Sequence, residues 1–306
     1  MVVTTEPSYT ELVNLNKKCN QSCVFCGAEG VIKAQSMKAV NAAIKRAGGH
    51  LTIGGWEPTL HPRLAAIVAR AKKAGVKNIT LFTNAVLLDD AAYVRQLISA
   101  GVRTFHINFP SHEEKLSDLL TGVPGSFRRR LAGVRNILTA PGRKYVSLVF
   151  VINSLNYKTM PAYARFVAQN FPGLVHVLFT APCVMGRAAQ KPSLVPRLAK
   201  IKPYLAAAQA AFLKNRVKCL VENVPLCLLP GAEHASFDAR NALMTGSAAA
   251  LAKSYRKECA GCSLRTLCPG LRDDYFRLYG SKELRPSKRR PEAVARAVKL
   301  LKAAQL

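Results

Sequence analysis

Short apolar runs alternate with longer amphipathic stretches along the first two thirds of the chain. The runs are rich in Val, Ile, Leu, Thr and aromatic residues, whereas the stretches between them are rich in Ala, Lys and Arg and repeat their apolar positions at helical spacing. We predict strands at Tyr9–Leu15, His50–Gly54, Asn78–Phe82, Arg103–Asn108, Tyr145–Ile152 and Val175–Thr180. We predict helices at Met37–Ala47, Pro62–Ala74, Asp89–Ala100, Phe127–Leu138 and Met160–Asn170.

Strands and helices in regular alternation are typical of a parallel sheet with helices packed outside it. Six such units predict an α/β fold, either an open doubly wound sheet or a partial (β/α)6 barrel. In both architectures the ligand-binding groups gather at the carboxyl ends of the strands. Gly, Asn, Pro and Cys follow the predicted strand ends in this chain, so we expect a binding site at that edge of the sheet.

The pattern changes after a long Ala- and Lys-rich helix that we predict at Leu194–Asn215. From Cys219 onward the alternation is lost, and five of the nine cysteines lie in this part. We therefore predict a barrel domain over residues 1–215, a cysteine-rich domain over residues 216–285, and a basic C-terminal tail over residues 286–306 that contains a helix at Pro291–Ala304.

Length and composition exclude several classes of protein. A chain of 306 residues with 49% hydrophobic residues is neither a mini-protein nor a disordered polycation. It has no apolar run near the ~20 residues that span a bilayer, and its N-terminus lacks the basic start and apolar core of a signal peptide. Nine cysteines in such a chain predict a reducing, cytoplasmic location, where clustered cysteines serve as metal ligands or catalysts rather than in disulfides.

A loop directly after the first predicted strand carries Cys19, Cys23 and Cys26 with C-x3-C-x2-C spacing. Three thiolates within eight residues can hold one metal centre but leave it one ligand short. A [4Fe–4S] cluster bound by three cysteines keeps one iron open for a substrate or cofactor. A zinc site that takes a distant fourth ligand is the alternative.

A second motif, Gly-Gly-Trp-Glu-Pro, follows the second predicted strand. Gly54 and Gly55 allow a ligand to approach the backbone closely, and Glu57 supplies an acceptor for an ammonium group. On its own, a pair of glycines at a strand end is an ordinary turn.

Together the two motifs resemble those of the radical S-adenosylmethionine (SAM) enzymes. The resemblance implies that the open iron chelates the amino and carboxylate groups of SAM, that aromatic Phe25 belongs to the cysteine motif, and that Gly54, Gly55 and Glu57 lie near the methionine amino group. Trp56 is inserted between the glycines and Glu57, which departs from the family's GGEP spacing.

The resemblance extends over residues 9–180. Thr83 and Asn84 close the third strand as in the family's TNG segment, although Ala85 replaces its glycine. The family implies a contact between Asn108 and the ribose of SAM. Two weaker candidates for contact with SAM, Asn153 and Asn156, follow the fifth strand. Each asparagine on its own is a common turn or capping residue.

A second group of cysteines has C-x2-C-x5-C spacing, with one further cysteine upstream. It resembles the SPASM and twitch extensions, which carry auxiliary iron–sulfur clusters in the same superfamily. The resemblance implies a shortened extension with one [4Fe–4S] cluster and four thiolate ligands, whereas an all-thiolate zinc site satisfies the same residues. The four ligands are Cys227, Cys259, Cys262 and Cys268.

Three positions near this group bear on the assignment. Arg272 stands where a full SPASM pattern would place another cysteine. Cys219 lies eight residues before Cys227 and could replace one of the four ligands. Cys183 follows the sixth strand at the barrel mouth and could meet the substrate. Without such a role, we expect Cys183 and Cys219 each to be a small buried hydrophobic residue.

The resemblance implies a reaction. One electron from a low-potential donor of the flavodoxin or ferredoxin type reduces the cluster, which cleaves SAM to methionine and a 5′-deoxyadenosyl radical, and this radical abstracts a hydrogen from the substrate. The protein orients the reactants and excludes water. The barrel motifs do not encode the substrate.

The net charge of the chain limits the chemical classes of substrate that we expect. The chain has 45 Lys and Arg against 17 Asp and Glu, a net charge of +28, which favours an anionic partner. Runs such as Arg128–Arg130 and Lys288–Arg290 are nevertheless most often solvated faces. The sequence contains no standard nucleic-acid-binding motif. The positive charge is then the one feature that favours nucleic acid as a partner.

Four functions remain in order of preference. The first is modification of a ribosomally made peptide or protein with an acidic segment, although we expect no leader-binding domain before the barrel because Cys19 lies so early. The second is modification of a small molecule or cofactor precursor that bears a nucleotide or phosphate; the glycine-rich C-terminus of the related molybdenum-cofactor enzyme is absent. Modification of RNA is the third. A basic, non-enzymatic metal-binding protein is the fourth.

Overall fold

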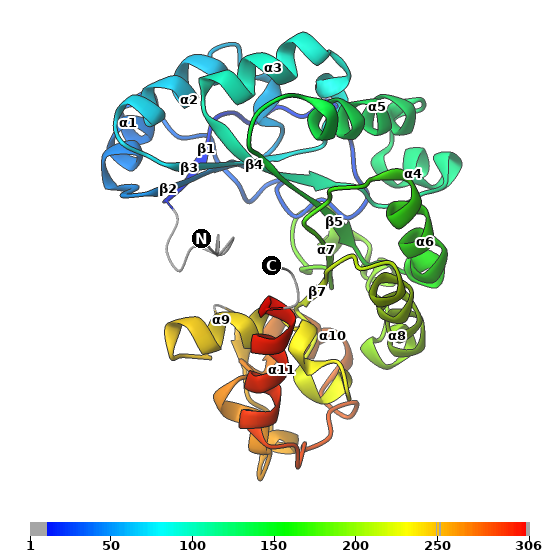
Figure 1. Cartoon of the computed structure of the whole chain (residues 1–306). Helices are drawn as coiled ribbons and strands as arrows, with labels where there is room; N and C mark the ends of the chain where they lie inside the picture. The colour runs from blue at the N-terminus through cyan, green and yellow to red at the C-terminus, as the bar shows by residue number, and fades with distance from the viewer. Residues whose placement is uncertain (1–10, 249, 251, 304–306) are drawn as a thin grey trace.

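The computed structural model describes residues 11–248, 250 and 252–303, and its centre is a parallel sheet. Seven strands pair in chain order, each parallel to the one before it. Figure 1 shows the sheet curving so that its concave side faces the C-terminal part of the chain. The strands are β1 (Glu11–Asn14), β2 (His50–Gly54), β3 (Asn78–Thr83), β4 (Val102–Asn108), β5 (Tyr145–Val151), β6 (His176–Thr180) and β7 (Cys219–Glu222).

Helices pack on one face of this sheet. Helix α2 shows why, because its apolar residues Leu64, Ile67, Val68 and Ala71 recur three or four positions apart and are all buried. The helices of the sheet region are α1 (Met37–Arg46), α2 (Leu64–Lys73), α3 (Ala91–Ala100), α4 (Glu114–Thr121), α5 (Ser126–Thr139), α6 (Met160–Asn170), α7 (Arg187–Gln190) and α8 (Leu198–Lys214).

Alternate positions on the strands face these helices and form the core. On β4, Phe105 and Ile107 are fully buried, as are Leu148 and Phe150 on β5. The intervening positions point to the opposite, concave face of the sheet. Figure 1 shows helices on the convex side and the C-terminal part of the chain across from the concave side. We call this concave side the inner face.

The C-terminal part has little regular structure. Strands β8 (Lys253–Ser254) and β9 (Leu271–Arg272) form a short antiparallel pair, and short turns of 3-10 helix carry Cys227 and Cys259. Its α-helices are α9 (Phe237–Thr245), α10 (Asp273–Tyr279) and α11 (Pro291–Ala303). Within the described residues, no helix is both long and apolar enough to cross a bilayer.

The predicted α/β fold with a partial barrel is confirmed. The six predicted strands and the predicted helices are all found, with ends that differ by a few residues; Tyr9 and Thr10 of the first strand lie outside the described residues. The analysis missed β7, whose four residues stand among turns, and α4, whose sequence EKLSDLLT is short and largely polar. Both lie beside the cysteines that the next section describes.

The predicted tail contains its helix, and that helix packs. Val294 of α11 is fully buried in a small apolar cluster with Leu226, Ala239, Ala242 and Leu264. The segment that we predicted as a separate basic tail therefore packs against the cysteine-rich part through buried apolar side chains. The division into domains stays a proposal.

Candidate functional site

The loop that carries the first three cysteines is held by three separate elements. The backbone N–H groups of Ser22 and Val24 donate to the last carbonyls of α4, at Thr121 (2.8 Å) and Leu120 (2.9 Å). The loop before Cys19 is fixed to the β2 turn, because the N–H of Glu57 donates to the carbonyl of Lys18 (3.0 Å). Elements far apart in the sequence thus define the course of this loop.

The third support comes from the segment after β6. The N–H of Arg187 donates to the carbonyl of Cys26 (2.8 Å), and its guanidinium donates to the carbonyl of Cys23 (3.1 Å) and pairs with Glu29. Gly186 has a φ of 57°, and a Cβ at this position would lie 2.6 Å from the same Cys26 carbonyl, so only glycine fits. The sequence analysis missed this contact because nothing in the local pattern marks it.

The three thiols lie within electrostatic range of one another. Burial raises the pKa of Cys19, and it raises the pKa of Cys23 to about 12; in both cases the neighbouring thiols add to the shift. Thiols of this kind stay protonated until a metal displaces the proton. The trio therefore fits a cluster in which each thiolate binds a different iron. Within the described ranges, no group of three or more His, Cys, Asp or Glu side chains has the spacing of a site for one metal ion.

Glu57 is buried, and its carboxylate is fully engaged. One oxygen accepts hydrogen bonds from the hydroxyls of Thr59 (2.6 Å) and Thr83 (2.8 Å) and from the N–H of Thr59 (3.0 Å), and the other accepts from the N–H of Asn84 (2.7 Å). Burial raises the pKa of this carboxyl, and the four hydrogen bonds oppose the shift. The carboxylate thus fastens the β2 turn to the end of β3.

Trp56 and the paired glycines complete this turn. The indole N–H of Trp56 donates to the carbonyl of Ile32 (3.1 Å), which ties the turn to the segment after the cysteines. Gly55 has a φ of 83°, and a Cβ there would lie 2.7 Å from the side-chain oxygen of Asn14. A direct contact between Glu57 and a ligand stays a prediction, and what the geometry supports is a positioning role.

Asn84 links this network to the cysteine loop. Its side-chain amide donates to the side-chain oxygen of Asn20 (2.7 Å) and lies 3.8 Å from the sulfur of Cys19. Its carbonyl accepts from the guanidinium of Arg130 (3.2 Å). The predicted cofactor residues Thr83 and Asn84 thus lie together, beside the cysteine that opens the motif.

Arg130 is a functional candidate that the sequence analysis treated as part of a surface run. Its side chain is fully buried, it donates to Ser117 (2.8 Å), and it lies close enough to Cys23 to lower the pKa of that thiol. Its neighbours Arg128 and Arg129 are exposed and pair with carboxylates on the surface. The distinction follows from helical geometry, because of the three consecutive residues Arg128, Arg129 and Arg130 only the last lies on the buried face of α5.

The remaining predicted residues lie at the same edge of the sheet. Phe25 is buried within the cysteine loop, and Asn108 ends β4 with its side-chain oxygen buried and unpartnered. Asn153 and Asn156 are fully buried in the turn after β5, where their side chains bind backbone groups, including the carbonyl of Pro110 (3.0 Å). The structure therefore gives these two asparagines a turn-forming role.

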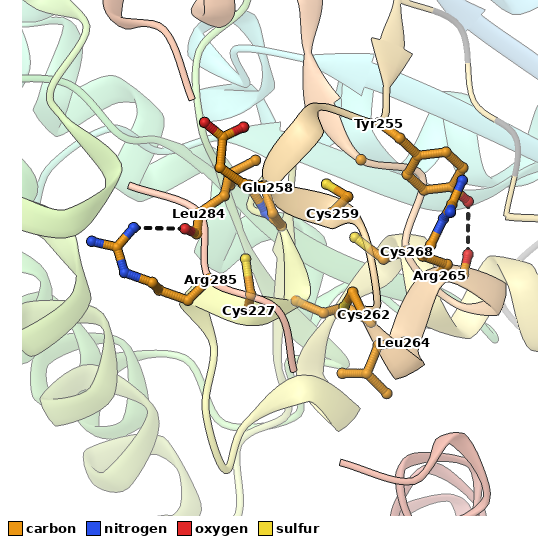
Figure 2. Close-up of a pocket in the computed structure, with 13 residues that line it drawn as sticks. Cys227, Tyr255, Glu258, Cys259, Cys262, Leu264, Arg265, Cys268, Leu284 and Arg285 are labelled. Carbon is orange, nitrogen blue, oxygen red and sulfur yellow. Dashed lines mark hydrogen bonds between the residues drawn. The ribbon is translucent and has the colours of Figure 1, made fainter. Parts of the chain in front are cut away.

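The second group of cysteines surrounds a pocket in the C-terminal part. Figure 2 shows the four cysteine side chains around one pocket. The space between the lining atoms is about 370 Å³ when the part open to solvent is included. The pocket lining includes Arg265, Leu284 and Arg285 as well. The four residues that the sequence analysis predicted as ligands are all in this lining: Cys227, Cys259, Cys262 and Cys268.

Two of the four sulfurs accept hydrogen bonds from the backbone. The N–H of Arg256 donates to Cys259 (3.5 Å) and the N–H of Ser287 to Cys262 (3.3 Å). Burial raises the pKa values of Cys227 and Cys268, and neighbouring backbone groups oppose both shifts. Hydrogen bonds to sulfur stabilise thiolates that bind metal, so the donors present fit an iron–sulfur cluster.

Cys183 and Cys219 stand apart from this pocket and are not in its lining. Cys219 lies on β7, where burial raises the pKa of its thiol well above the ordinary value. Cys183 lies near the Arg272–Asp274 ion pair, and burial raises the pKa of its thiol as well. Neither supplies a ligand to the four-cysteine pocket in this geometry.

Comparison with known proteins places these features in context. Residues 13–167 match the family model described as the Radical SAM superfamily. The chain is 26% identical over 182 residues to a probable GTP 3′,8-cyclase of Sulfurisphaera tokodaii (57% of each chain) and 30% identical over 165 residues to that of Thermoplasma volcanium (51% of this chain, 49% of the relative). It thus spans about half the length of these relatives.

Solved structures share the fold. Streptococcus suis SuiB superposes with a TM-score of 0.55 at 16% identity, over 70% of this chain and 49% of SuiB. The enzyme anSMEcpe, solved with bound AdoMet and the Cp18Cys peptide, superposes with a TM-score of 0.58 at 12% identity, over 97% of both chains. The second superposition includes the C-terminal part, so the likeness in fold extends beyond the sheet.

Proposed function

Because this chain belongs to the radical SAM superfamily, we propose that Cys19, Cys23 and Cys26 hold its [4Fe–4S] cluster and leave one iron open for SAM. The chain is an enzyme of this class and uses both cofactors. When bound, they supply a 5′-deoxyadenosyl radical that abstracts a hydrogen from the substrate. The experiment is anaerobic reconstitution followed by measurement of 5′-deoxyadenosine; if none forms from SAM and reductant, the assignment is wrong.

In this assignment the chain's own residues position the cofactors. Gly54 and Gly55 would lie near the methionine end of SAM; Gly55 also admits the side chain of Asn14 against the β2 turn, and Glu57 holds that turn against Asn84. Asn84 in turn orients the loop through Asn20. Asn108 offers a buried oxygen without a partner, which a ribose hydroxyl would satisfy.

We propose that the four-cysteine pocket holds an auxiliary [4Fe–4S] cluster. The observation that carries the proposal is the convergence of four cysteine side chains on one pocket, two of which accept backbone N–H hydrogen bonds at sulfur. Metal analysis of a variant that lacks Cys19, Cys23 and Cys26 tests it. About four irons per chain would support the cluster, and zinc in their place would contradict it.

We propose a peptide or protein with an acidic segment as the substrate. The net charge of +28 favours an anionic partner, and the fold likeness over nearly the whole chain is to an enzyme solved with a peptide. Screening of short acidic and neutral peptides for stimulated formation of 5′-deoxyadenosine, at low and high salt, tests this class. Stimulation by acidic peptides that weakens with salt is the expected result.

A nucleotide-bearing small molecule is the second candidate. It is favoured by the curated relatives, which are named probable GTP 3′,8-cyclases and match over about half of this chain. GTP belongs in the same assay as the peptides. Stimulation of SAM cleavage by GTP but not by peptides would reverse the order of the two proposals.

The enzyme also needs an external electron donor. We propose a flavodoxin or ferredoxin, whose acidic surface complements the charge of this chain. We also propose a reducing, cytoplasmic location, because seven of the nine cysteines are assigned here as cluster ligands, and disulfide formation would remove them. Dependence of the reduction rate on ionic strength with a purified flavodoxin tests the partner.

A further inference from the structure

The inner face of the sheet is the surface that the helices leave open. Side chains on it are more exposed than those on the helix-covered face, and the exposed fraction reaches 50% for Leu12 and 42% for Phe82. Figure 1 shows the C-terminal part opposite this face. Leu12 and Phe82 both lie beside Gly54, so their exposed apolar surfaces are neighbours on this face, and a contiguous exposed apolar patch indicates a binding surface.

Four side chains stand in one row across this face. The strand registers pair Phe82 with His106, His106 with Ser147, and Ser147 with His176, so that β3, β4, β5 and β6 each contribute one residue. Residues paired across parallel strands point to the same side of the sheet. We call these four residues the aromatic row.

The rings of the row are in contact. The centroids of Phe82 and His106 lie 4.7 Å apart at an angle of 35°, and those of His106 and His176 lie 6.0 Å apart. The hydroxyl of Ser147 is hydrogen-bonded to Nδ1 of His106, which fixes the orientation of that imidazole. On the β2 side, Gly54 has no side chain that would cover Phe82; a Cβ there would lie 3.7 Å from it.

The row carries no charge at neutral pH. Burial lowers the pKa of His106 to about 4. It also lowers the pKa of His176, where His106, Lys218 and Arg240 add to the shift. Both imidazoles are therefore neutral hydrogen-bonding groups.

One atom of the row lacks a partner. Nδ1 of His176 is buried without a hydrogen bond, and only 7% of this residue is exposed. Buried polar atoms in native structures nearly always have a hydrogen-bond partner, so this nitrogen is available to a group that the chain itself does not supply. The imidazole of His176 contacts that of His106, which in turn contacts the accessible ring of Phe82, so the three rings form one continuous row.

We propose that the aromatic row binds an uncharged planar ring of the substrate, which stacks on Phe82 and hydrogen-bonds to the imidazoles. The inference rests on the proposed function and deepens it: the anionic part of the substrate lies outside the row, and the ring is what the row selects. A nucleobase and an aromatic side chain of a peptide share this chemistry. The test has one arm for each.

The experiment uses the reconstituted full chain loaded with SAM. Ligand-observed NMR measures the binding of guanosine, of N-acetyl-L-tryptophanamide, and of N-acetyl-L-leucinamide as a non-planar control. We expect one ring probe to bind more tightly than the leucine compound. Guanosine as the tighter ligand assigns the ring to a nucleotide, and the tryptophan compound assigns it to a peptide.

Two variants connect the binding to the row. F82L keeps an apolar side chain but removes the ring, and we expect the ring probe to bind about 5- to 10-fold more weakly. H176Q changes the unpartnered group, and we expect a similar loss. F276L is the matched control, because Phe276 is an aromatic residue of the C-terminal part with a similar exposure of 37%.

Affinity for SAM and unstimulated SAM cleavage should stay unchanged in F82L. The proposal is overturned if neither ring probe binds better than the leucine compound, if F82L leaves the ring probe's affinity unchanged, or if F82L weakens SAM binding by the same factor, since the row would then serve the cofactor. Each of these results leaves the proposed function standing as long as the wild type cleaves SAM.

Discussion

The two cysteine sites of this protein are built in different ways. The loop of Cys19, Cys23 and Cys26 takes its course from α4, the β2 turn and the segment after β6, which are distant in sequence. The four-cysteine pocket has main-chain N–H groups beside its sulfurs, and some of them, such as that of Ser287 before α11, are also distant in sequence. Both sites therefore depend on tertiary contacts, but side chains such as Arg187 and Asn84 contribute to the first, whereas the donors to sulfur in the second are main-chain groups.

This difference has a consequence for mutagenesis. Side chains that are distant from the loop in sequence but close to it in space, such as Glu57 and Arg130, support the first site. Their replacement should therefore disturb it. The second site is supported by main-chain donors, which side-chain changes leave in place. The following experiments test that contrast, from the largest expected effect to the smallest.

The largest effect is expected from C23A set against C268A. Loss of Cys23 should reduce formation of 5′-deoxyadenosine to background while the C-terminal site retains its iron, about four atoms per chain. C268A should lose the iron of the second site but retain unstimulated SAM cleavage. Assays of iron, sulfide and 5′-deoxyadenosine on both variants check this. Equal loss of SAM cleavage in the two would show that the sites are not independent.

Arg130 should contribute strongly to stability. R130M removes a buried cation and leaves the Asn84 carbonyl and the Ser117 hydroxyl without their donor, so we expect the free energy of unfolding to fall by about 3 kcal/mol. R129M is the matched control; Arg129 is half exposed and pairs with Asp89, and its loss should cost about 1 kcal/mol or less. Denaturant unfolding of both variants measures the difference, and equal losses would refute the positioning role.

Acid should destabilise the sheet region before the C-terminal part. The folded pKa of His106, about 4, lies below the unfolded value, so its contribution is complete above pH 6.5 and is lost as pH falls toward 4. We expect a loss of about 2 kcal/mol between pH 6.5 and 5 that H106Q lacks. In the C-terminal part the pKa of Asp274 is lowered beside Arg272, despite burial, so its contribution is lost only at more acidic pH. Unfolding curves for wild type and H106Q at both pH values measure this, and identical pH dependence would contradict it.

The smallest effect concerns the second site. S287P removes the N–H that donates to the Cys262 sulfur, whereas S287A keeps it. We expect S287P to bind iron at this site about 10-fold more weakly, with SAM cleavage unaffected. The rate of iron loss to a chelator measures the change. The same rate in both variants would mean that the hydrogen bond does not support the site.

Much of the fold was accessible from the sequence because the strands and helices of the sheet region have clear periods. His50–Gly54 and Met160–Asn170 were predicted with the ends that the structure has. β7 was missed because four residues among turns give no period, and α4 because a short polar helix gives a weak one.

The candidate site also has features that the sequence predicted and features that it did not. Motif spacing identified the cysteines and the Gly54–Gly55 turn, but it did not reveal that the Glu57 carboxylate binds Thr59, Thr83 and Asn84. Nor could it separate Arg130 from its exposed neighbours. Hydrogen-bond partners distant in sequence follow from the packing of elements, and a single sequence does not record that packing.

The sequence by itself determined the family, the α/β class and the residues able to hold metal, because each rests on residue identity at short spacing. The tertiary structure decided which side chains meet: the four thiols at one pocket, the network from Glu57 to Cys19, and the row of Phe82, His106, Ser147 and His176. Strand register assembles that row from four separate segments. Register depends on how the whole sheet packs, and for that reason the local pattern could not predict it.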